Sequence, residues 1–317
     1  MTKNGRSAPS LSFVVVVYDM PDQARRTLHS LSPAYQREAR ADDYEVVVVE
    51  NASPRLLGRD AALASGPNVR YFLRERPEPS PVPAINFGAA QSAGAMLGVM
   101  IDGARLLTPG IVALALKAQR LSSDAVLSIP GYHLGDQPQQ TAAAAGYDEA
   151  AEARLLERIG WPQDGYRLFE IACFSASCAD GFFLPIAESN CLCLPRALFE
   201  DLGGFDDGFR LPGGGFSNLD FYARACDHPR SELYLAPGEG TFHQFHGGIT
   251  TSGDPNRDRV MSDFTDEYRA LRGGAFVKPA REPAFLGAIP GAAGGFVRIS
   301  VEHYAAASAE KEPSPVG

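Results

Sequence analysis

The chain lacks the features that identify several large classes of protein. Its 317 residues contain neither a dense block of lysine and arginine nor a long apolar run, whereas a membrane-spanning helix needs roughly 18 or more apolar residues. The formal net charge is −9, and phosphate backbones are bound by clustered cations. We therefore expect a protein without a transmembrane segment and without a nucleic-acid partner.

Cysteine is scarce and irregularly spaced. The 5 cysteines include no C-x-x-C pair, the spacing that structural zinc sites and redox motifs use. Buried free thiols in a reducing compartment explain them. Residues 1–10 are too short and too polar for a signal peptide, so we expect a cytoplasmic protein, with association to a membrane surface left open. An apolar fraction of 45% is enough for a sizeable globular core.

Two valine runs stand out near the start of the chain. Residues 11–17 lead through four valines to Tyr18 and Asp19, and residues 46–49 lead to Glu50 and Asn51. Such runs are typical of central parallel strands that helices cover on both faces. Residues 21–39 between them begin with a proline and have helical spacing. Together these segments predict a βαβ unit.

Further strands and helices follow in alternation. We expect strands at 69–73 and 96–102, a strand and turn within 125–134, and helices at 84–95, 109–121, 147–161, 196–202, 217–226 and 257–274. The strand at 96–102 again ends on a carboxylate, Asp102. Ligands of open α/β sheets bind outside the carboxyl ends of the strands, so we expect Asp19, Glu50 and Asp102 to line one cleft.

The order of these features resembles the family 2 glycosyltransferases of the GT-A fold, over about residues 11 to 250. "VVVVYDMP" looks like the opening strand of the family, and "VVVVENAS" looks like the second strand, whose acidic residue contacts the nucleobase. "INFGAAQSAGAMLGVMIDGA" is similar to the helix and strand that carry the DxD motif, and "LFEDLGGFDDGF" to a segment that shapes the acceptor side.

The resemblance implies an α/β fold of the GT-A, Rossmann-like type, with a mixed, mostly parallel sheet flanked by helices. It predicts one domain over residues 11–253, with a nucleotide-sugar half at 11–121 and an acceptor half at 122–253. Around it we expect a flexible N-terminus at 1–10, a helical extension at 254–305 and, by composition, a disordered tail at 306–317.

The departures from the family pattern bear on chemistry. The DxD motif holds Mn²⁺ or Mg²⁺ with carboxylate oxygens, but it reads Asp102-Gly103-Ala104 here, so the second carboxylate is missing. The base position of the family falls on Asn218, and an amide cannot take a proton from the acceptor. We expect Asp220 to be the base instead, with Glu188 as its rival.

The remaining site residues follow from the same resemblance. Positions three apart on a strand face opposite sides, so we expect only His246, and not His243, to join Asp102 as a ligand of a divalent cation. For some positions a plainer reading is also open: a helix cap for Asn86, a turn cap for Asp102 and a solvent-facing side chain for Arg105. The predicted nucleotide-sugar contacts are Tyr18, Asp19, Glu50, Asn51, Asn86, Asp102 and Arg105, and the predicted acceptor-side residues are Gly214, Gly215 and Asn218.

The function implied is that of an inverting glycosyltransferase, which moves a hexosyl or related group from a nucleoside diphosphate sugar to an unknown acceptor. The altered motifs leave a second hypothesis open, namely a non-catalytic protein that binds a nucleotide or glycan or assists another enzyme. A sugar-nucleotide nucleotidyltransferase ranks last, because its glycine-rich, lysine-bearing loop is missing after the first strand.

Overall fold

Two valine-rich strands, β1 (Leu11–Val17) and β2 (Tyr44–Asn51), pair in parallel at the centre of the N-terminal half. In the computed structural model, which describes residues 8–248 and 256–311, every residue of both strands is buried. Successive side chains of a strand point to opposite faces, and alternate valines of β2 accordingly pack in two different hydrophobic cores. The prediction of strands buried on both faces is confirmed.

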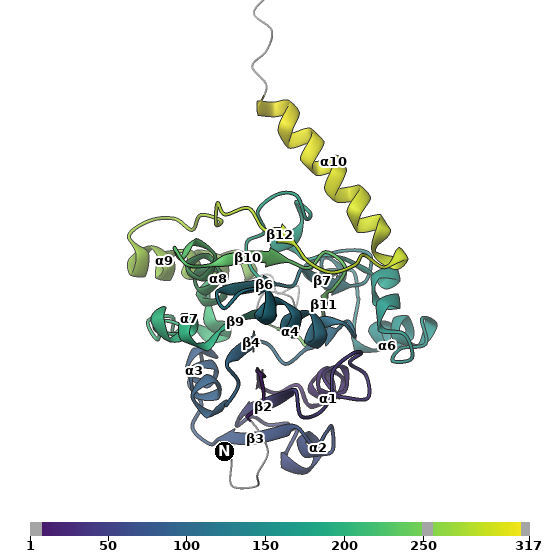
Figure 1. Ribbon diagram of the computed structural model, residues 1–317, viewed down its shortest axis with the longest axis vertical. Helices are drawn as coiled ribbons and strands as arrows, with labels where there is room; N and C mark the ends of the chain where they lie inside the picture. The colour runs from purple at the N-terminus through teal and green to yellow at the C-terminus, as the bar shows by residue number, and fades with distance from the viewer. Residues whose placement is uncertain (1–7, 249–255, 312–317) are drawn as a thin grey trace, which may run out of the picture.

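These strands belong to a sheet of eight, in the order β12-β10-β6-β9-β4-β1-β2-β3 (Figure 1). Neighbours run parallel, except that β9 is antiparallel to both β4 and β6. The predicted mixed, mostly parallel sheet is therefore confirmed. The other strands are β3 (Val69–Arg74), β4 (Met96–Met100), β6 (Ala125–Ser128), β9 (Leu192–Pro195), β10 (Glu232–Leu235) and β12 (Ala284–Phe285).

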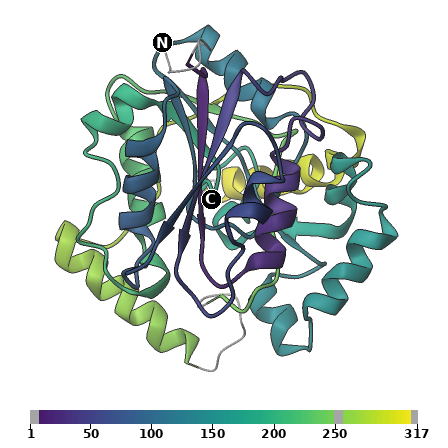
Figure 2. The same ribbon diagram turned by 90° about the horizontal axis from the view of Figure 1, so that it is seen from below.

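Helices cover both faces of this sheet. Figures 1 and 2 show α1 and α3 on opposite sides of the N-terminal strands, and the two hydrophobic cores divide in the same way. The helices of one face are α1 (Pro21–Ser30), α2 (Arg59–Leu63) and α4 (Ile111–Leu121). Those of the other face are α3 (Val82–Gln91), α7 (Arg196–Asp201) and α8 (Ser217–Asp227).

A second sheet of four strands, in the order β5-β11-β7-β8, adjoins the end of β4. Because β5 follows β4 after a short turn and pairs with β11, this sheet brings a distant segment to the end of β4. Its strands are β5 (Arg105–Leu107), β7 (Gly131–Leu134), β8 (Ala172–Phe174) and β11 (Thr241–His243), and the helices α5 (Gln139–Ala144) and α6 (Glu149–Arg158) follow β7.

Two local predictions are wrong. The helix expected over 21–39 ends at Ser30, because the chain turns at Leu31, ahead of a proline. Asn86 lies inside α3 and therefore does not cap that helix.

The C-terminal region joins the main body rather than forming a purely helical extension. After α9 (Arg257–Arg272), the short strand β12 pairs with β10 at the sheet edge. Ala293, just before helix α10 (Gly294–Lys311), and Phe296 in its first turn pack in the core, and the helix then projects away from the sheets (Figure 1). Residues 306–311 are thus helical where a disordered tail was expected, which suits their alanine-rich composition.

The ends of the predicted tail and N-terminus, 312–317 and 1–7, lie outside the described residues, as do 249–255. Within the described ranges, none of the helices is long and apolar enough to cross a lipid bilayer.

Candidate active site

Four neighbouring strands, β4, β1, β2 and β3, run parallel and end at one edge of the main sheet. Their register aligns Val17 with Glu50, and Asn51 with Arg74. Asp102 follows the end of β4. The strand ends therefore lie side by side, as the topology of open α/β sheets requires.

Asp102, His243 and His246 form a compact cluster at this edge. Oδ2 of Asp102 lies 2.9 Å from Nε2 of His243 and 3.7 Å from Nε2 of His246. The two histidine Nε2 atoms are 3.2 Å apart. Two imidazole nitrogens and one carboxylate oxygen within such a distance of one another can hold a divalent cation.

Both histidines enter the cluster, so the expectation that only His246 does so is wrong. The alternation rule applies within a strand, but β11 ends at His243 and the chain then turns. The turn brings the next histidine back to the same side. The sequence signal for this arrangement was the presence of two histidines, three residues apart, at the end of a strand.

A hydrogen bond fixes the orientation of the His243 ring. Its Nδ1 contacts Oε1 of Gln139, and Nε2 of Gln139 donates to the main-chain carbonyl of His243. The amide thus presents its oxygen to the ring, which places the proton on Nδ1. Burial lowers the pKa of His243 to about 4. The ring is therefore neutral at pH 7, and its Nε2 lone pair faces the Asp102 carboxylate, an arrangement that a cation between them stabilises.

Arg105, the first residue of β5, is directly paired with His243. Its side chain is only 10% exposed, and its Nε lies 3.5 Å from Oδ2 of Asp102. Neither Nε nor Nη1 has a hydrogen-bond partner among the described residues. Burial lowers the pKa of Arg105, while Asp102 and Glu188 raise it. The solvent-facing reading of this arginine is wrong; a buried guanidinium with unused donors suits an anion such as a diphosphate.

Glu188 lies close enough to Arg105 to influence it electrostatically. One of its oxygens, Oε2, accepts a hydrogen bond of 2.7 Å from Nδ2 of Asn218, in the first turn of α8. Glu188 is half-buried. A carboxylate held by an amide in this way keeps its second oxygen available to accept a proton.

Asp220 is poorly placed to be a base. Its carboxylate is 2% exposed and is clamped by two guanidinium groups. Nε of Arg272 lies 2.6 Å from Oδ1, while Nη2 of Arg272 and Nε of Arg224 each lie 2.8 Å from Oδ2. Both oxygens are therefore engaged in ion pairs, and the geometry favours Glu188 over Asp220.

Three polar or aromatic residues form a row across the ends of β1, β2 and β3. Tyr18 directly follows β1 and is 53% exposed; the register pairs the last residue of β1, Val17, with Glu50, and the next residue of β2, Asn51, with Arg74. Oδ1 of Asn51 and Nη1 of Arg74 are buried without a hydrogen-bond partner among the described residues. The guanidinium of Arg74 also pairs through Nη2 with Glu78 at 2.8 Å. The exposed ring of Tyr18 can contact a nucleobase. The sequence reasoning missed Arg74, although it ends β3 as Asn51 ends β2.

Two predicted contacts of the nucleotide are used inside the protein instead. Glu50 is fully buried, and its carboxylate accepts hydrogen bonds from the backbone of Leu57 and Gly58 and from the hydroxyl of Tyr71. The expected role of Glu50 at the nucleobase is therefore not supported, because its oxygens hold the loop after β2. Asp19 pairs with Arg55 of the same loop at 3.2 Å.

Asn86, predicted to contact the nucleotide sugar, and the predicted acceptor-side residues also have structural roles. Asn86 bonds the backbone of Phe205 through both its amide oxygen and its amide nitrogen. It therefore holds the segment after α7 rather than facing a ligand. Gly214 and Gly215 have positive φ of 83° and 55°, a conformation that side chains disfavour. Their loop leads directly into α8, which carries Asn218.

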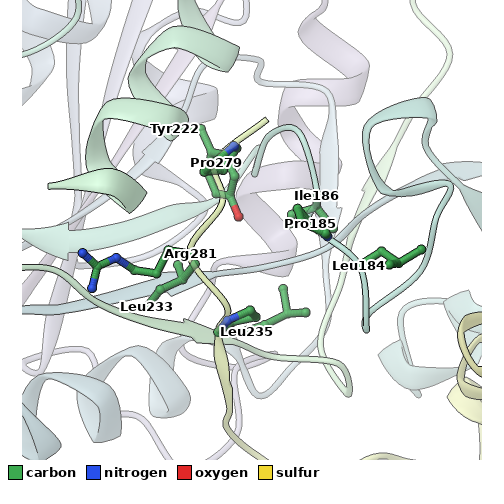
Figure 3. Close-up of a pocket in the computed structure, with 9 residues that line it drawn as sticks. Leu184, Pro185, Ile186, Tyr222, Leu233, Leu235, Pro279 and Arg281 are labelled. Atoms are coloured by element: carbon green, nitrogen blue, oxygen red, sulfur yellow. The ribbon is translucent and has the colours of Figure 1, made fainter. Parts of the chain in front are cut away.

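A separate small pocket lies under the segment between α9 and β12 (Figure 3). The guanidinium of Arg281 points away from Ile186 and donates to the backbone carbonyls of Ser231 and His228. The lining is otherwise largely apolar and includes none of the predicted site residues, so we read it as a packing feature. The lining residues are Leu184, Pro185, Ile186, Tyr222, Leu233, Leu235, Pro279, Arg281 and Pro283.

Sequence comparison adds no relative: no protein-family model matches the chain, and neither does any curated protein. Solved structures do match. The glycosyltransferase TarS of S. aureus, residues 1–349 in complex with UDP, aligns with a TM-score of 0.50 at 13% identity, over 83% of this chain and 72% of that one. The chain therefore shares the overall fold of this structure.

Two further TarS structures give similar alignments. Residues 1–349 align with a TM-score of 0.47 and a longer chain with 0.48, each at 12% identity and over 83% of this chain. The present chain spans 44% of that longer TarS chain.

Proposed function

We propose that the protein is an inverting glycosyltransferase that uses a nucleoside diphosphate sugar. The observation that carries the proposal is the grouping of Asp102, His243 and His246 with Arg105 at the carboxyl ends of the strands. Two nitrogens of the Arg105 guanidinium, Nε and Nη1, make no hydrogen bond among the described residues. A cation and a guanidinium together match the charge of a departing diphosphate. The glycosyltransferase fold is consistent with this chemistry.

The nucleoside would bind at the row formed by Tyr18, Asn51 and Arg74. The exposed Tyr18 ring offers a surface for the base, and the unused polar atoms of Asn51 and Arg74 offer an acceptor and a donor. The neighbour TarS was solved with UDP, so UDP is the first nucleotide to test.

The residues present fit a divalent cation. Asp102, His243 and His246 would hold it, and when bound it would supply charge neutralisation at the diphosphate. Oδ1 of Asp102 accepts a hydrogen bond of 2.9 Å from the backbone of Ala104. Oδ2 is thus the ligand atom, and the alanine that replaces the second DxD carboxylate adds none.

In the transfer step, Glu188 would take the proton of the acceptor hydroxyl or amine as the acceptor attacks the anomeric carbon. The new bond to the anomeric carbon forms as the bond to the diphosphate oxygen breaks, and that oxygen keeps the bonding electrons. Arg105 lies where it can neutralise this charge. Asn218 holds Oε2 of Glu188 and thereby orients the base.

The competing hypothesis is a fold that binds nucleotide without catalysing transfer. The loss of the Asp at position 218 and of the second DxD carboxylate favours it, whereas the Glu188–Asn218 contact and the free donors of Arg105 favour an active enzyme. The two hypotheses differ in donor turnover and agree on nucleotide binding.

The test is a thermal-shift panel of nucleoside diphosphates with and without Mn²⁺, followed by a hydrolysis assay with the diphosphate hexoses of each nucleotide that binds. We expect Glu188→Gln to keep nucleotide binding and to lower the rate at least about 100-fold. Glu200→Gln, on an exposed glutamate of α7, is the matched control. Absence of a shift with every nucleotide would refute the proposal, and wild-type hydrolysis by the Glu188 variant would refute the assigned base.

A further inference from the structure

Three aromatic side chains from separate segments form an exposed cluster beside α10. Phe183 lies in the loop after β8, Phe285 ends β12, and Tyr304 lies on α10. The ring centroid of Phe183 is 5.6 Å from that of Phe285 and 6.2 Å from that of Tyr304. The three residues are 37%, 49% and 51% exposed, respectively. Contiguous apolar patches on a protein surface mark interaction sites, and aromatic residues are enriched in such interfaces.

The start of α10 is anchored firmly to the main body. Phe296 is buried, and its ring centroid lies 4.8 Å from those of Tyr132 and Phe174. The hydroxyl of Ser300, which is also buried, accepts a hydrogen bond of 3.0 Å from the backbone NH of Phe182. These contacts fix the direction in which the rest of the helix leaves the body (Figure 1).

The second half of α10 lacks such support. Of residues 301–310, all except Ala307 are exposed, although a short helix gains most of its stability from packing rather than from propensity. Val301 and Tyr304 lie one turn apart on the same face, so they extend the aromatic cluster along the helix. The next residues, 305–309, read "AAASA". Their small side chains leave room for the bulky side chains of a second surface.

We propose that the free half of α10 docks on a second copy of this chain, with the two helices antiparallel about a twofold axis near Tyr304. In this arrangement residues 305–309 of each copy cover the cluster of Phe183, Phe285 and Tyr304 of the other. The same surface carries both the large and the small side chains that fit together, as a twofold interface requires. The inference is independent of the proposed function.

The charges along α10 favour the antiparallel orientation. Arg298 lies near the anchored end and Glu310 near the free end, and both are exposed. An antiparallel pair brings Arg298 of one copy towards Glu310 of the other, whereas a parallel pair would place like charges together. It also sets the two helix dipoles in opposite directions. The same balance of charges disfavours an anionic membrane as the partner, because helices that lie on such membranes are rich in lysine and arginine.

The experiment is sedimentation equilibrium of the full chain at about 1–100 μM. We expect a mass of twice 33.9 kDa at the higher concentrations. Tyr304→Glu places two carboxylates beside the twofold axis and should raise the dissociation constant of the dimer at least about 10-fold. Ala306→Pro should have a similar effect, because proline breaks the free half of the helix.

The control is Leu63→Glu, a similar change at a residue that is 38% exposed. Leu63 ends α2, which packs against β3 at the opposite edge of the main sheet from β12, so this variant should remain a dimer. The orientation is tested by charge reversal. Arg298→Glu and Glu310→Arg should each raise the dissociation constant about 2- to 5-fold, and the double variant should restore it.

A monomer over the whole concentration range would overturn the inference, as would a dimer that both Tyr304→Glu and Ala306→Pro leave intact. A monomer that sediments with vesicles of phosphatidylcholine and phosphatidylglycerol would assign the aromatic cluster to a lipid surface and refute the pairing. Failure of the double charge reversal to restore the dissociation constant would refute the antiparallel orientation. Nucleotide binding by these variants should equal that of the wild type, because the nucleoside row lies across the ends of β1, β2 and β3, towards the other edge of the sheet.

Discussion

Glu152 allows a quantitative test of how the loop between the two histidines is held. It lies on α6 with a fully buried side chain, and its Oε2 accepts the hydrogen bond from Phe245 at 2.6 Å. Its other oxygen has no hydrogen-bond partner among the described residues and lies 3.5 Å from a guanidinium nitrogen of Arg26. The perturbation is Glu152→Gln, which keeps the shape of the side chain and fixes it in a neutral form.

Burial raises the pKa of Glu152 from 4.5 to about 8, an increase that the Phe245 hydrogen bond and Arg26 only partly offset. Between these two values the folded protein holds the proton and the unfolded chain does not. Unfolding then releases a proton, so stability falls as the pH rises, by about 1.4 kcal/mol per pH unit. From pH 5.5 to 7.5 the expected loss is about 2–3 kcal/mol.

The assay is urea unfolding at pH 5.5 and 7.5, in EDTA so that metal binding adds no pH dependence of its own. The wild type should lose about 2–3 kcal/mol more than Glu152→Gln between the two pH values. Glu157→Gln, on the exposed side of the same helix, should behave as the wild type. Equal losses in the wild type and the Glu152 variant would show that this carboxyl is already ionised in the fold and paired with Arg26, and would refute the reasoning.

Two further substitutions test packing and the assignment of the base. Asp220→Ala leaves the guanidinium groups of Arg224 and Arg272 without their buried partner. It should therefore lower the free energy of unfolding in urea by about 3–5 kcal/mol. Unchanged stability together with lost turnover would instead favour Asp220 as the base. Gly88→Ala makes the new Cβ overlap Cγ1 of Val14 and should lower the free energy of unfolding by about 1–3 kcal/mol in the same assay. A Cβ added at Gly291 meets nothing within 4 Å, so Gly291→Ala should leave the free energy of unfolding unchanged. Equal stabilities of the two glycine variants would contradict the packing argument.

Local sequence patterns determined most of the sheet and the helices around it. The valine runs of β1 and β2 are buried at every position, and a continuous apolar run is typical of a strand that helices cover on both faces. The turn to polar residues at Tyr18, Asn51 and Asp102 marks where these strands leave the core. Because parallel strands end at one edge, this pattern also located the candidate site.

The partners of individual side chains were decided only by the tertiary structure. The sequence alone made Glu50 and Asp220 suitable for ligand binding or catalysis, yet both are occupied by backbone or guanidinium groups from other segments. His243 joins the cluster because β11 pairs with β5, whose sequence lies far from its own. A polar group is free for a ligand only if folding brings no partner to it from a distant segment. A local sequence pattern does not predict such partners.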